Sequence, residues 1–299
     1  MVEAHSESQV RDVVLAGRAE GRTIMSRGSG FSYGDPALNG GNLVLDLRPM
    51  NRVITWDEER GIIDLEPGVT VGDLCRHVAS AGWWPPVLPG TKGPTMGGCA
   101  AANVHGKNNW KLGTFGEHVI ELDFMLADGT TVTCGPEQDK DLFVAVLGGF
   151  GLLGVITRVR LQMQPGSGEL HVEQYAAPEL EDVMAIFERW TGRADYMVGW
   201  IDGFASGQSL GRGLVQVADT TESSRSAASM DRRTSWLRDS LRSHGHLALR
   251  PFATRTGLRA AAAAQYTWGA LQNGRGEYIT RERFHFFHDT IPNWNQAFP

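Results

Sequence analysis

Two glycine-rich segments in the first half of the chain constrain its fold more than any other feature. The first, RGSGFSYGD at residues 27–35, holds three glycines in nine residues, and the second runs from Pro89 to Trp110. Closely spaced glycines let a backbone approach an anion and surround it with N–H groups. The first segment lacks the Gly-Lys-Ser/Thr ending of a mononucleotide loop and the Gly-x-Gly-x-x-Gly spacing of a Rossmann turn. Two such segments in one domain predict an extended, phosphate-bearing cofactor held from two sides.

Charge and cysteine content exclude several other classes of protein. The net charge of −6 argues against a general nucleic-acid binder, which needs clustered Lys and Arg. The three cysteines, Cys75, Cys99 and Cys134, show neither zinc-site spacing nor a disulfide framework, which predicts buried thiols in a reducing compartment. No signal peptide and no apolar run of about 18 residues is visible, so we expect a cytoplasmic protein without a transmembrane helix. Peripheral contact with a membrane stays open.

The order of predicted elements indicates an α+β protein with two domains, at residues 1–165 and 166–299. In the first domain, apolar periodicity predicts helices at residues 8–21 and 70–82. A strand is expected at 22–28, a meander of short strands at 42–47, 52–57 and 61–68, a hairpin at 118–134, and a long final strand that ends at Pro165. Thr70 and Asp73 have the spacing of a capping box at the start of the second helix.

The second domain is expected to be a partial α+β domain that binds substrate. We expect strands at 169–177 and 196–204 and helices at 178–190 and 257–271. A polar loop is expected at 218–235, and the last segment, from residue 281, is expected to begin as a strand. We expect the chain to be the first part of a longer protein.

The sequence HGKN in the second glycine-rich segment holds the candidate catalytic residues. His105 and Lys107 place an imidazole and an ammonium on either side of a glycine. A cation beside an electron-accepting ring would stabilise its anionic reduced form. The alternative is a loop histidine and a solvated lysine without a role in catalysis.

Five motifs in this order resemble the vanillyl-alcohol-oxidase type of FAD-binding domain, also called PCMH-type. They are RGSGFSYGD, PGTKGPTMGG, NVHGKN, GTFGEHV and GGFGLLGVITRVRLQ. The HGKN segment followed by Gly-Thr-Phe-Gly is similar to the decaprenylphosphoryl-ribose oxidase branch of the family, whose members serve as the flavin subunit of an epimerase. The resemblance covers residues 9–165 and continues more weakly beyond them.

The resemblance implies roles for individual residues. The FAD pyrophosphate would be wrapped by Ser26, Arg27, Gly28, Ser29, Gly30, Phe31, Ser32, Tyr33, Gly34, Asp35 and Pro36, and further by Gly90, Thr95, Met96, Gly97 and Gly98. The flavin would lie beside Ala102, Asn103, Val104 and His105, and the adenine end beside Val155. His105 and Lys107 would face the flavin ring and the substrate.

Phe31 bears on how the flavin is held. Family members that oxidise aldonolactones or alditols often have a histidine at this point, bonded covalently to the flavin. Phenylalanine cannot form that bond, so the resemblance implies non-covalent FAD, with a covalent bond from His105 as the alternative.

The reaction implied is oxidation of a secondary alcohol on a sugar, with hydride passing to flavin N5 and an unidentified base taking the hydroxyl proton. The expected substrate is a polyprenyl-phosphate pentose, a precursor of cell-wall arabinan, and an epimerase would need a separate short-chain reductase as partner. A soluble aldonolactone or alditol oxidase that uses O₂ and a non-catalytic FAD-fold paralogue remain alternatives. A lysine and a cysteine that line the site in the resembled branch would lie beyond Pro299.

Three other features suggest sites but have plainer explanations. The pairs His244–His246 and His285–His288 have the spacing of metal ligands. No carboxylate or cysteine occurs at the sequence spacing that would complete a metal site, so no metal site is predicted. His288 could instead lie near the substrate, and Trp200 belongs either to the core or to the pocket wall.

Overall fold

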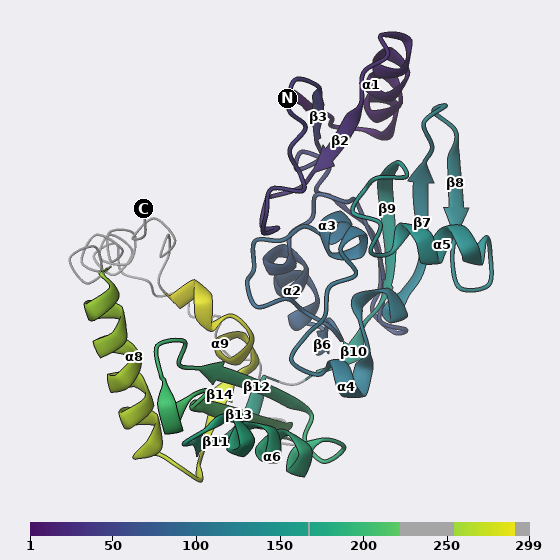
Figure 1. Ribbon diagram of the computed structural model, residues 1–299. Helices are drawn as coiled ribbons and strands as arrows, with labels where there is room; N and C mark the ends of the chain where they lie inside the picture. The colour runs from purple at the N-terminus through teal and green to yellow at the C-terminus, as the bar shows by residue number, and fades with distance from the viewer. Residues whose placement is uncertain (167, 222–253, 291–299) are drawn as a thin grey trace, which may run out of the picture. The chain divides into compact units, whose positions relative to one another are not determined.

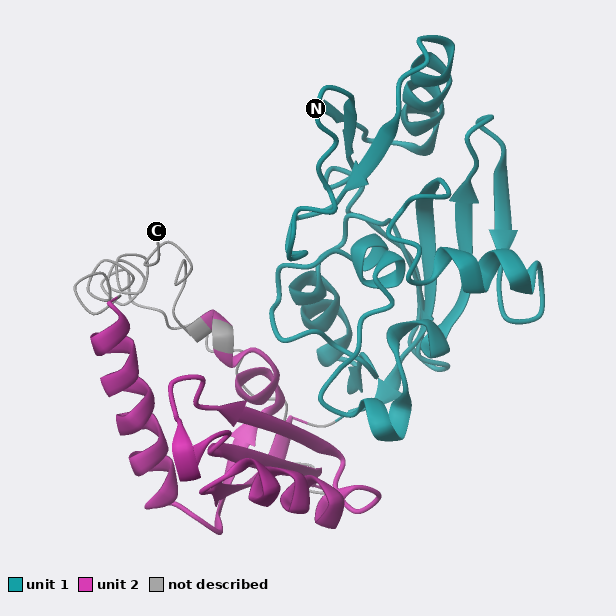
Figure 2. Cartoon of the chain, in the orientation of Figure 1, with its two compact units in different colours: residues 1–166 teal, residues 167–299 magenta. Residues whose placement is uncertain are grey.

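A computed structural model describes residues 1–166, 168–221 and 254–290 of the chain. The chain divides into two compact units, Met1–Gly166 and Ser167–Pro299, which Figures 1 and 2 show. Each unit combines helices with β-sheet, which confirms the predicted α+β class. No helix among these residues is both long enough and apolar enough to span a membrane.

The first unit begins with a small parallel sheet covered by a helix. The sheet has the order β1-β3-β2, and its strands are β1 (Val2–Glu3), β2 (Ile24–Arg27) and β3 (Leu43–Asp46). Helix α1 (Glu7–Ala19) is capped by Ser6 and buries Val10 and Val14 against Leu45 in one core cluster. The predicted helix at 8–21 is therefore confirmed.

The predicted meander is wrong for β3. This strand pairs in parallel with β2 instead of antiparallel with the next strand along the chain. Parallel pairing needs a long connection, and the glycine-rich loop between β2 and β3 supplies one. The alternation of apolar residues in 42–47 predicts a strand but not its partner.

A five-stranded antiparallel sheet is the larger sheet of the first unit. Its order is β4-β5-β9-β7-β8, and its strands are β4 (Val53–Asp57), β5 (Ile62–Leu65), β7 (Val119–Met125), β8 (Thr131–Cys134) and β9 (Val155–Gln162). The β4–β5 pair and the β7–β8 hairpin confirm those parts of the prediction. Helix α3 (Met96–Ala101) contacts β9, and Leu122, Val159 and Leu161 are buried. Smaller elements complete the unit: α2 (Val71–Ala79), β6 (Trp83–Trp84), α4 (Asn109–Leu112), η1 (Phe115–His118), α5 (Lys140–Val146) and β10 (Gln164–Pro165).

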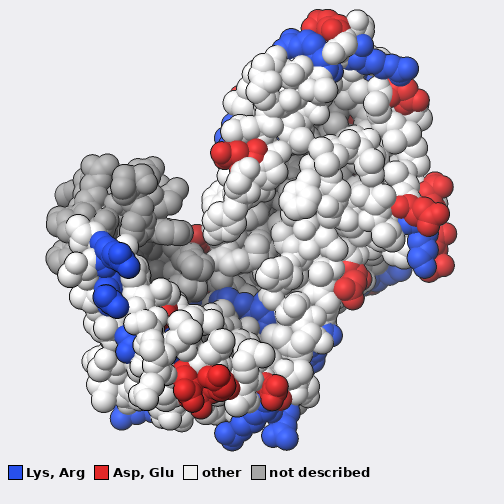
Figure 3. All heavy atoms as spheres, viewed as in Figure 1, with Lys and Arg blue, Asp and Glu red and all other residues white. Residues whose placement is uncertain are grey.

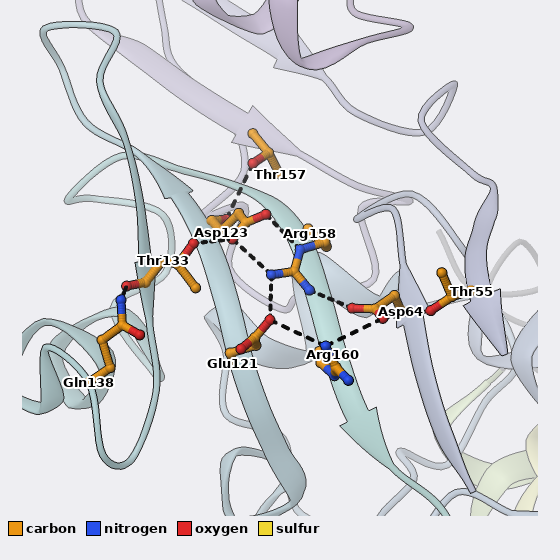
Figure 4. Close-up of polar contacts among 9 residues, drawn as sticks. All are labelled: Thr55, Asp64, Glu121, Asp123, Thr133, Gln138, Thr157, Arg158 and Arg160. Carbon is orange, nitrogen blue, oxygen red and sulfur yellow. Dashed lines mark hydrogen bonds and ion pairs between the residues drawn. The ribbon is translucent and has the colours of Figure 1, made fainter. Parts of the chain in front are cut away.

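A half-buried ion network crosses three strands of this sheet (Figure 4). Arg158 on β9 donates to Asp64 on β5 and, at 2.6 Å each, to Glu121 and Asp123 on β7. Arg160 lies 3.7 Å from Glu121. These side chains alternate along β9 with buried Val159 and Leu161, so the network occupies the opposite face of the sheet from the core.

The predicted capping box at the start of α2 is confirmed. The Thr70 hydroxyl accepts a hydrogen bond from the Asp73 N–H at 3.1 Å, and the Asp73 carboxylate accepts from the Thr70 N–H at 3.4 Å. Burial alone would raise the pKa of Asp73, but hydrogen bonds from Thr70 and the charge of Arg76 outweigh it and lower that pKa. The cap satisfies two groups that the helix leaves without intrahelical partners.

Replacing Thr70 with alanine should lower the free energy of unfolding by about 1 kcal/mol, because one helical N–H loses its side-chain acceptor. Urea unfolding followed by circular dichroism measures the change. Thr70→Ser keeps the hydroxyl and is the matched control. Equal losses in the two variants would show that the methyl group, and not the cap, matters.

The second unit is built on a four-stranded antiparallel sheet of order β12-β13-β11-β14. The strands are β11 (Glu169–Ala177), β12 (Tyr196–Ile201), β13 (Gly213–Thr220) and β14 (Arg275–Thr280); the helical elements are α6 (Leu180–Trp190), η2 (Gly207–Ser209), α8 (Arg255–Ala270), α9 (Arg281–His285) and η4 (Phe287–Thr290). One cluster buries Leu170, Tyr196 and Phe284 together.

Two predictions for the second unit need correction. The polar loop expected from residue 218 begins later, because Ala218 and Asp219 continue strand β13; residues 222–235 lie outside the described part of the chain. The strand-like start expected at residue 281 is helix α9. Thr280 caps this helix by accepting from Arg283 N–H at 3.2 Å, a local interaction that outweighs the β-propensity of the aromatic residues that follow.

Candidate cofactor site

The first glycine-rich loop begins at the end of β2, and its backbone N–H groups are available to a ligand. Within the described residues, the N–H groups from Gly28 to Gly34 donate no hydrogen bond to the protein. Gly30, Gly34 and Asp35 have positive φ angles of 72°, 73° and 57°. Successive N–H groups in such a turn form a concave donor surface that suits a phosphate. The residues predicted to wrap the pyrophosphate, from Ser26 to Pro36, form this surface or lie directly next to it along the chain.

Two glycines let this loop meet the second segment. A Cβ atom at Gly28 would overlap Thr95 Oγ1, and one at Gly93 would overlap the Phe31 ring. Phe31 nevertheless keeps 54% of its surface exposed, and Tyr33 keeps 96%. The two predicted cofactor loops are therefore in direct contact, with aromatic surface left open beside them.

Helix α3 supports the second loop. Its N-cap, Thr95, accepts from Gly98 N–H, while Met96 N–H and Gly97 N–H donate to Val69 and Pro67 carbonyls at 2.8 and 2.9 Å. The N–H groups of Met96 and Gly97 are thus already bonded to the protein, and both residues are buried. Gly98 is exposed and Ala101 is partly exposed, so a ligand can reach the helix at these two residues. Gly90, Ala102 and Val104 are partly exposed along the same segment.

The candidate catalytic pair lies on a turn that buried groups hold in place. Asn108 is 2% exposed and donates to the Pro86 carbonyl at 2.9 Å. A Cβ atom at Gly106 would lie 2.7 Å from Asn108 Oδ1 and 3.2 Å from the Leu88 carbonyl oxygen, so only glycine fits there. His105 is exposed, whereas Lys107 is half-buried, and loss of water lowers the pKa of Lys107 to about 8. The HGKN motif thus includes an anchoring residue, Asn108, that its sequence pattern did not single out.

A third glycine-rich loop, residues 147–154, joins the other two. Phe150 N–H donates to the Ala101 carbonyl at 2.9 Å, and a Cβ atom at Gly151 would lie 2.8 Å from Ser26 Oγ. Leu152 is 75% exposed at the tip of this loop. Val155, predicted to touch the adenine, has its side chain in the core, so a contact from this residue would use its backbone.

Backbone strain is concentrated in these three loops. Among the described residues, four non-glycine residues have positive φ, and three of them, Asp35, Asn103 and Phe150, lie one in each loop. Such conformations cost free energy and persist where the surrounding structure holds them, often at ligand sites. In the view of Figure 3, the charged side chains of the first unit lie mainly toward its edges, and the middle of this face is uncharged. The Arg27 guanidinium nevertheless lies at the first loop, where a Cβ atom at Gly30 would overlap it, so it adds a positive charge to the backbone N–H groups. The loops therefore fit an extended cofactor with a pyrophosphate.

The remaining candidates belong to the second unit. His285 is buried in the second unit, Trp200 is half-buried on β12, and the His288 side chain and the pair His244–His246 lie outside the described residues. No group of three or more potential metal ligands occurs among the residues that the structure describes. All three cysteines are buried, and burial raises the pKa of Cys99 to about 12.

Comparison with known proteins identifies the cofactor that these loops fit. Residues 1–135 match the model of a family described as FAD binding domain. The chain is 35% identical to a decaprenylphosphoryl-beta-D-ribose oxidase of Mycolicibacterium smegmatis over 69% of its own length and 45% of the relative's. It is 28% identical to L-gulonolactone oxidase of Mus musculus over 64% of its length and 42% of the relative's. A delta(24)-sterol reductase of Homo sapiens matches at 29% over 52% of the chain and 29% of the relative. The chain spans less than half of each of these relatives.

Proposed function

The first 135 residues of this chain are an FAD-binding domain of the PCMH type, and from this premise we propose that the protein is an FAD-dependent oxidoreductase that acts on a secondary alcohol of a sugar. The observation that carries the proposal is the meeting of three glycine-rich loops beside a turn that bears His105 and a half-buried Lys107. FAD, when bound, supplies the acceptor for the two electrons removed from the alcohol.

Each part of the site has a separate task in this proposal. The open N–H groups of residues 28–34 hold the pyrophosphate. Thr95, the N-cap of α3, packs against Gly28 and holds this loop in place. Lys107, as an ammonium below pH 8, stabilises the negative charge that develops on the cofactor during the reaction. His105, exposed on the same turn, contacts the substrate.

For the substrate we propose a polyprenyl-phosphate pentose. Its support is the 35% identity to a decaprenylphosphoryl-beta-D-ribose oxidase, the highest identity among the three relatives described above. Under this proposal a separate short-chain reductase returns the hydride to complete an epimerisation, and a lipid-linked substrate brings the protein to the membrane surface from the cytoplasm. Reduction of the bound flavin by a polyprenyl-phosphate pentose, and not by the free pentose, would support this choice.

A soluble aldonolactone oxidase is the second candidate, and the similarity to L-gulonolactone oxidase favours it. Flavin reduction by free aldonolactones with production of hydrogen peroxide would identify that activity. A protein that binds FAD but reacts with neither class would be a non-catalytic paralogue.

We predict that the flavin is bound without a covalent link. Phe31 carries no nucleophile and packs its ring on Gly93, so the loop position at which a histidine would link the flavin offers no atom for that bond. A visible absorption spectrum before and after acid precipitation measures this directly. Free yellow flavin in the supernatant is the expected result. Yellow colour in the pellet would contradict the prediction and point to a bond from His105.

The pH dependence of the flavin potential should report Lys107. Because desolvation places the pKa of Lys107 near 8, its ammonium is present below that pH and is lost as the pH rises through it. We therefore expect the potential to fall more steeply with pH around 8 than flavin chemistry alone requires. Lys107→Met should remove this inflection and slow reduction roughly tenfold or more. Lys111→Met, on the exposed face of α4, is the control, and an unchanged inflection in Lys107→Met would refute the assignment.

A further inference from the structure

Asn103 is unusual among the loop residues because its backbone and its side chain both join neighbouring segments. Its φ angle is +42°, in the left-handed region that few residues other than glycine, asparagine and aspartate adopt readily. Its N–H donates to the Ala100 carbonyl at 3.0 Å, which ends α3. The chain therefore turns sharply at Asn103, two residues before His105.

The side chain of Asn103 connects this turn to the segment that follows α4. Asn103 Oδ1 accepts a hydrogen bond from Gly116 N–H at 2.9 Å. The partner is a donor, so the oxygen of the amide, and not its NH₂ group, must face it. A Cβ atom at Gly116 would lie 2.9 Å from the same oxygen, which shows how closely the two segments pack. A Cβ atom at Gly148 would lie 3.7 Å from Asn103 Cβ, so the third glycine-rich loop packs here too.

The backbone beyond Asn103 continues the same attachment. Phe115 N–H donates to the Val104 carbonyl at 2.9 Å, and His105 forms an antiparallel bridge with Thr114. Thr114 in turn caps η1, because the Glu117 carboxylate accepts from Thr114 N–H at 3.0 Å. Val104 and His105 are thus paired with Phe115 and Thr114, and that segment is held by its own capping box.

We infer that Asn103 is a positioning residue that sets the place of the His105–Lys107 turn beside the cofactor. The inference rests on the proposed function, because the turn has a task only if FAD binds here. Asn103 meets two requirements at once: a left-handed backbone and a hydrogen-bond acceptor aimed at Gly116. Aspartate meets both, glycine meets only the first, and alanine meets neither.

Three substitutions in the full chain separate these requirements. FAD is titrated into apoprotein by fluorescence, and the visible circular dichroism of the bound flavin reports its surroundings. We expect the dissociation constant to rise about tenfold or more in Asn103→Ala, to rise about threefold in Asn103→Gly, and to stay at the value of the unaltered protein in Asn103→Asp. The flavin dichroism should change in the alanine variant and return toward that of the unaltered protein in the aspartate variant.

Asp139→Ala is the matched control. Asp139 also has a left-handed backbone, with φ of +47°, but it precedes α5 and makes no side-chain cap there. Its replacement should lower the melting temperature without changing FAD affinity. If Asn103→Ala does the same and no more, or if aspartate fails to rescue, the inference is overturned. If the alanine variant does not fold, the comparison of glycine with aspartate decides, since equal affinities in those two would refute the role of the acceptor. Failure of the unaltered protein to bind FAD would instead overturn the proposed function itself.

Discussion

Replacing Gly28 with alanine should weaken FAD binding on the order of 10- to 100-fold while leaving the protein folded. A Cβ atom at this position would overlap Thr95 Oγ1, and Thr95 cannot turn away without losing its hydrogen bond to Gly98 N–H at the start of α3. Overpacking of this kind costs about 1–3 kcal/mol, which here separates the first loop from the second. The φ angle of Gly28 is not in the left-handed region, so the effect comes from the contact alone.

Gly40→Ala is the control for this prediction. Gly40 lies in the same connection between β2 and β3, and a Cβ atom there would meet no atom within 4 Å. Titration with FAD should give the unaltered affinity in Gly40→Ala. Adding Thr95→Ala to Gly28→Ala should restore part of the affinity, because the overlapping hydroxyl is gone. Unchanged binding in Gly28→Ala would show that the two loops do not need to meet to hold the cofactor.

Replacing Arg158 with leucine should lower the free energy of unfolding of the first unit by about 2–4 kcal/mol. Arg158 is 19% exposed and is paired with Asp64, Glu121 and Asp123, so its loss leaves one buried and two half-buried carboxylates near one another. Breaking a fully buried pair costs about 3–5 kcal/mol, and partial exposure of this network reduces that figure. Urea unfolding of the apoprotein, followed by tryptophan fluorescence, measures the difference.

Arg160→Leu is the matched control on the same face of β9. Arg160 is 35% exposed and lies 3.7 and 3.9 Å from its partners, so its removal should cost less than about 1 kcal/mol. Equal losses in the two variants would show that the arginine stems, and not the ion pairs, stabilise the sheet.

The pH dependence of the Arg158 effect follows from Asp123. Burial alone would raise the pKa of Asp123, but hydrogen bonds from Arg158 and Thr133 and the charge of Arg158 outweigh it and lower that pKa. A lowered folded-state pKa contributes stability above the unfolded value and loses it as the pH falls through the folded one. The difference between Arg158→Leu and the unaltered protein should therefore be complete at neutral pH and shrink below about pH 4.

The sequence alone determined the features that depend on neighbouring residues. The cap of Thr70 on α2, the β7–β8 hairpin and the glycine-rich loop after β2 are local patterns. This loop and the second glycine-rich segment together indicate a phosphate-bearing cofactor, which neither indicates alone. Family resemblance then named FAD, which the family model supports. Strands such as β3 were placed correctly along the chain for the same local reason.

Only the tertiary structure decided which of these local pieces meet. The parallel pairing of β3 with β2, the contact of Gly28 with Thr95, and the bond from Gly116 to Asn103 join residues that no periodicity links. The carboxylates of the Arg158 network come from β5 and β7, the two strands that flank β9, and their spacing in the sequence does not show that they meet. Conformational preference is a property of a short segment, whereas packing depends on the whole chain, so the loops could be recognised in the sequence but their assembly into one site could not.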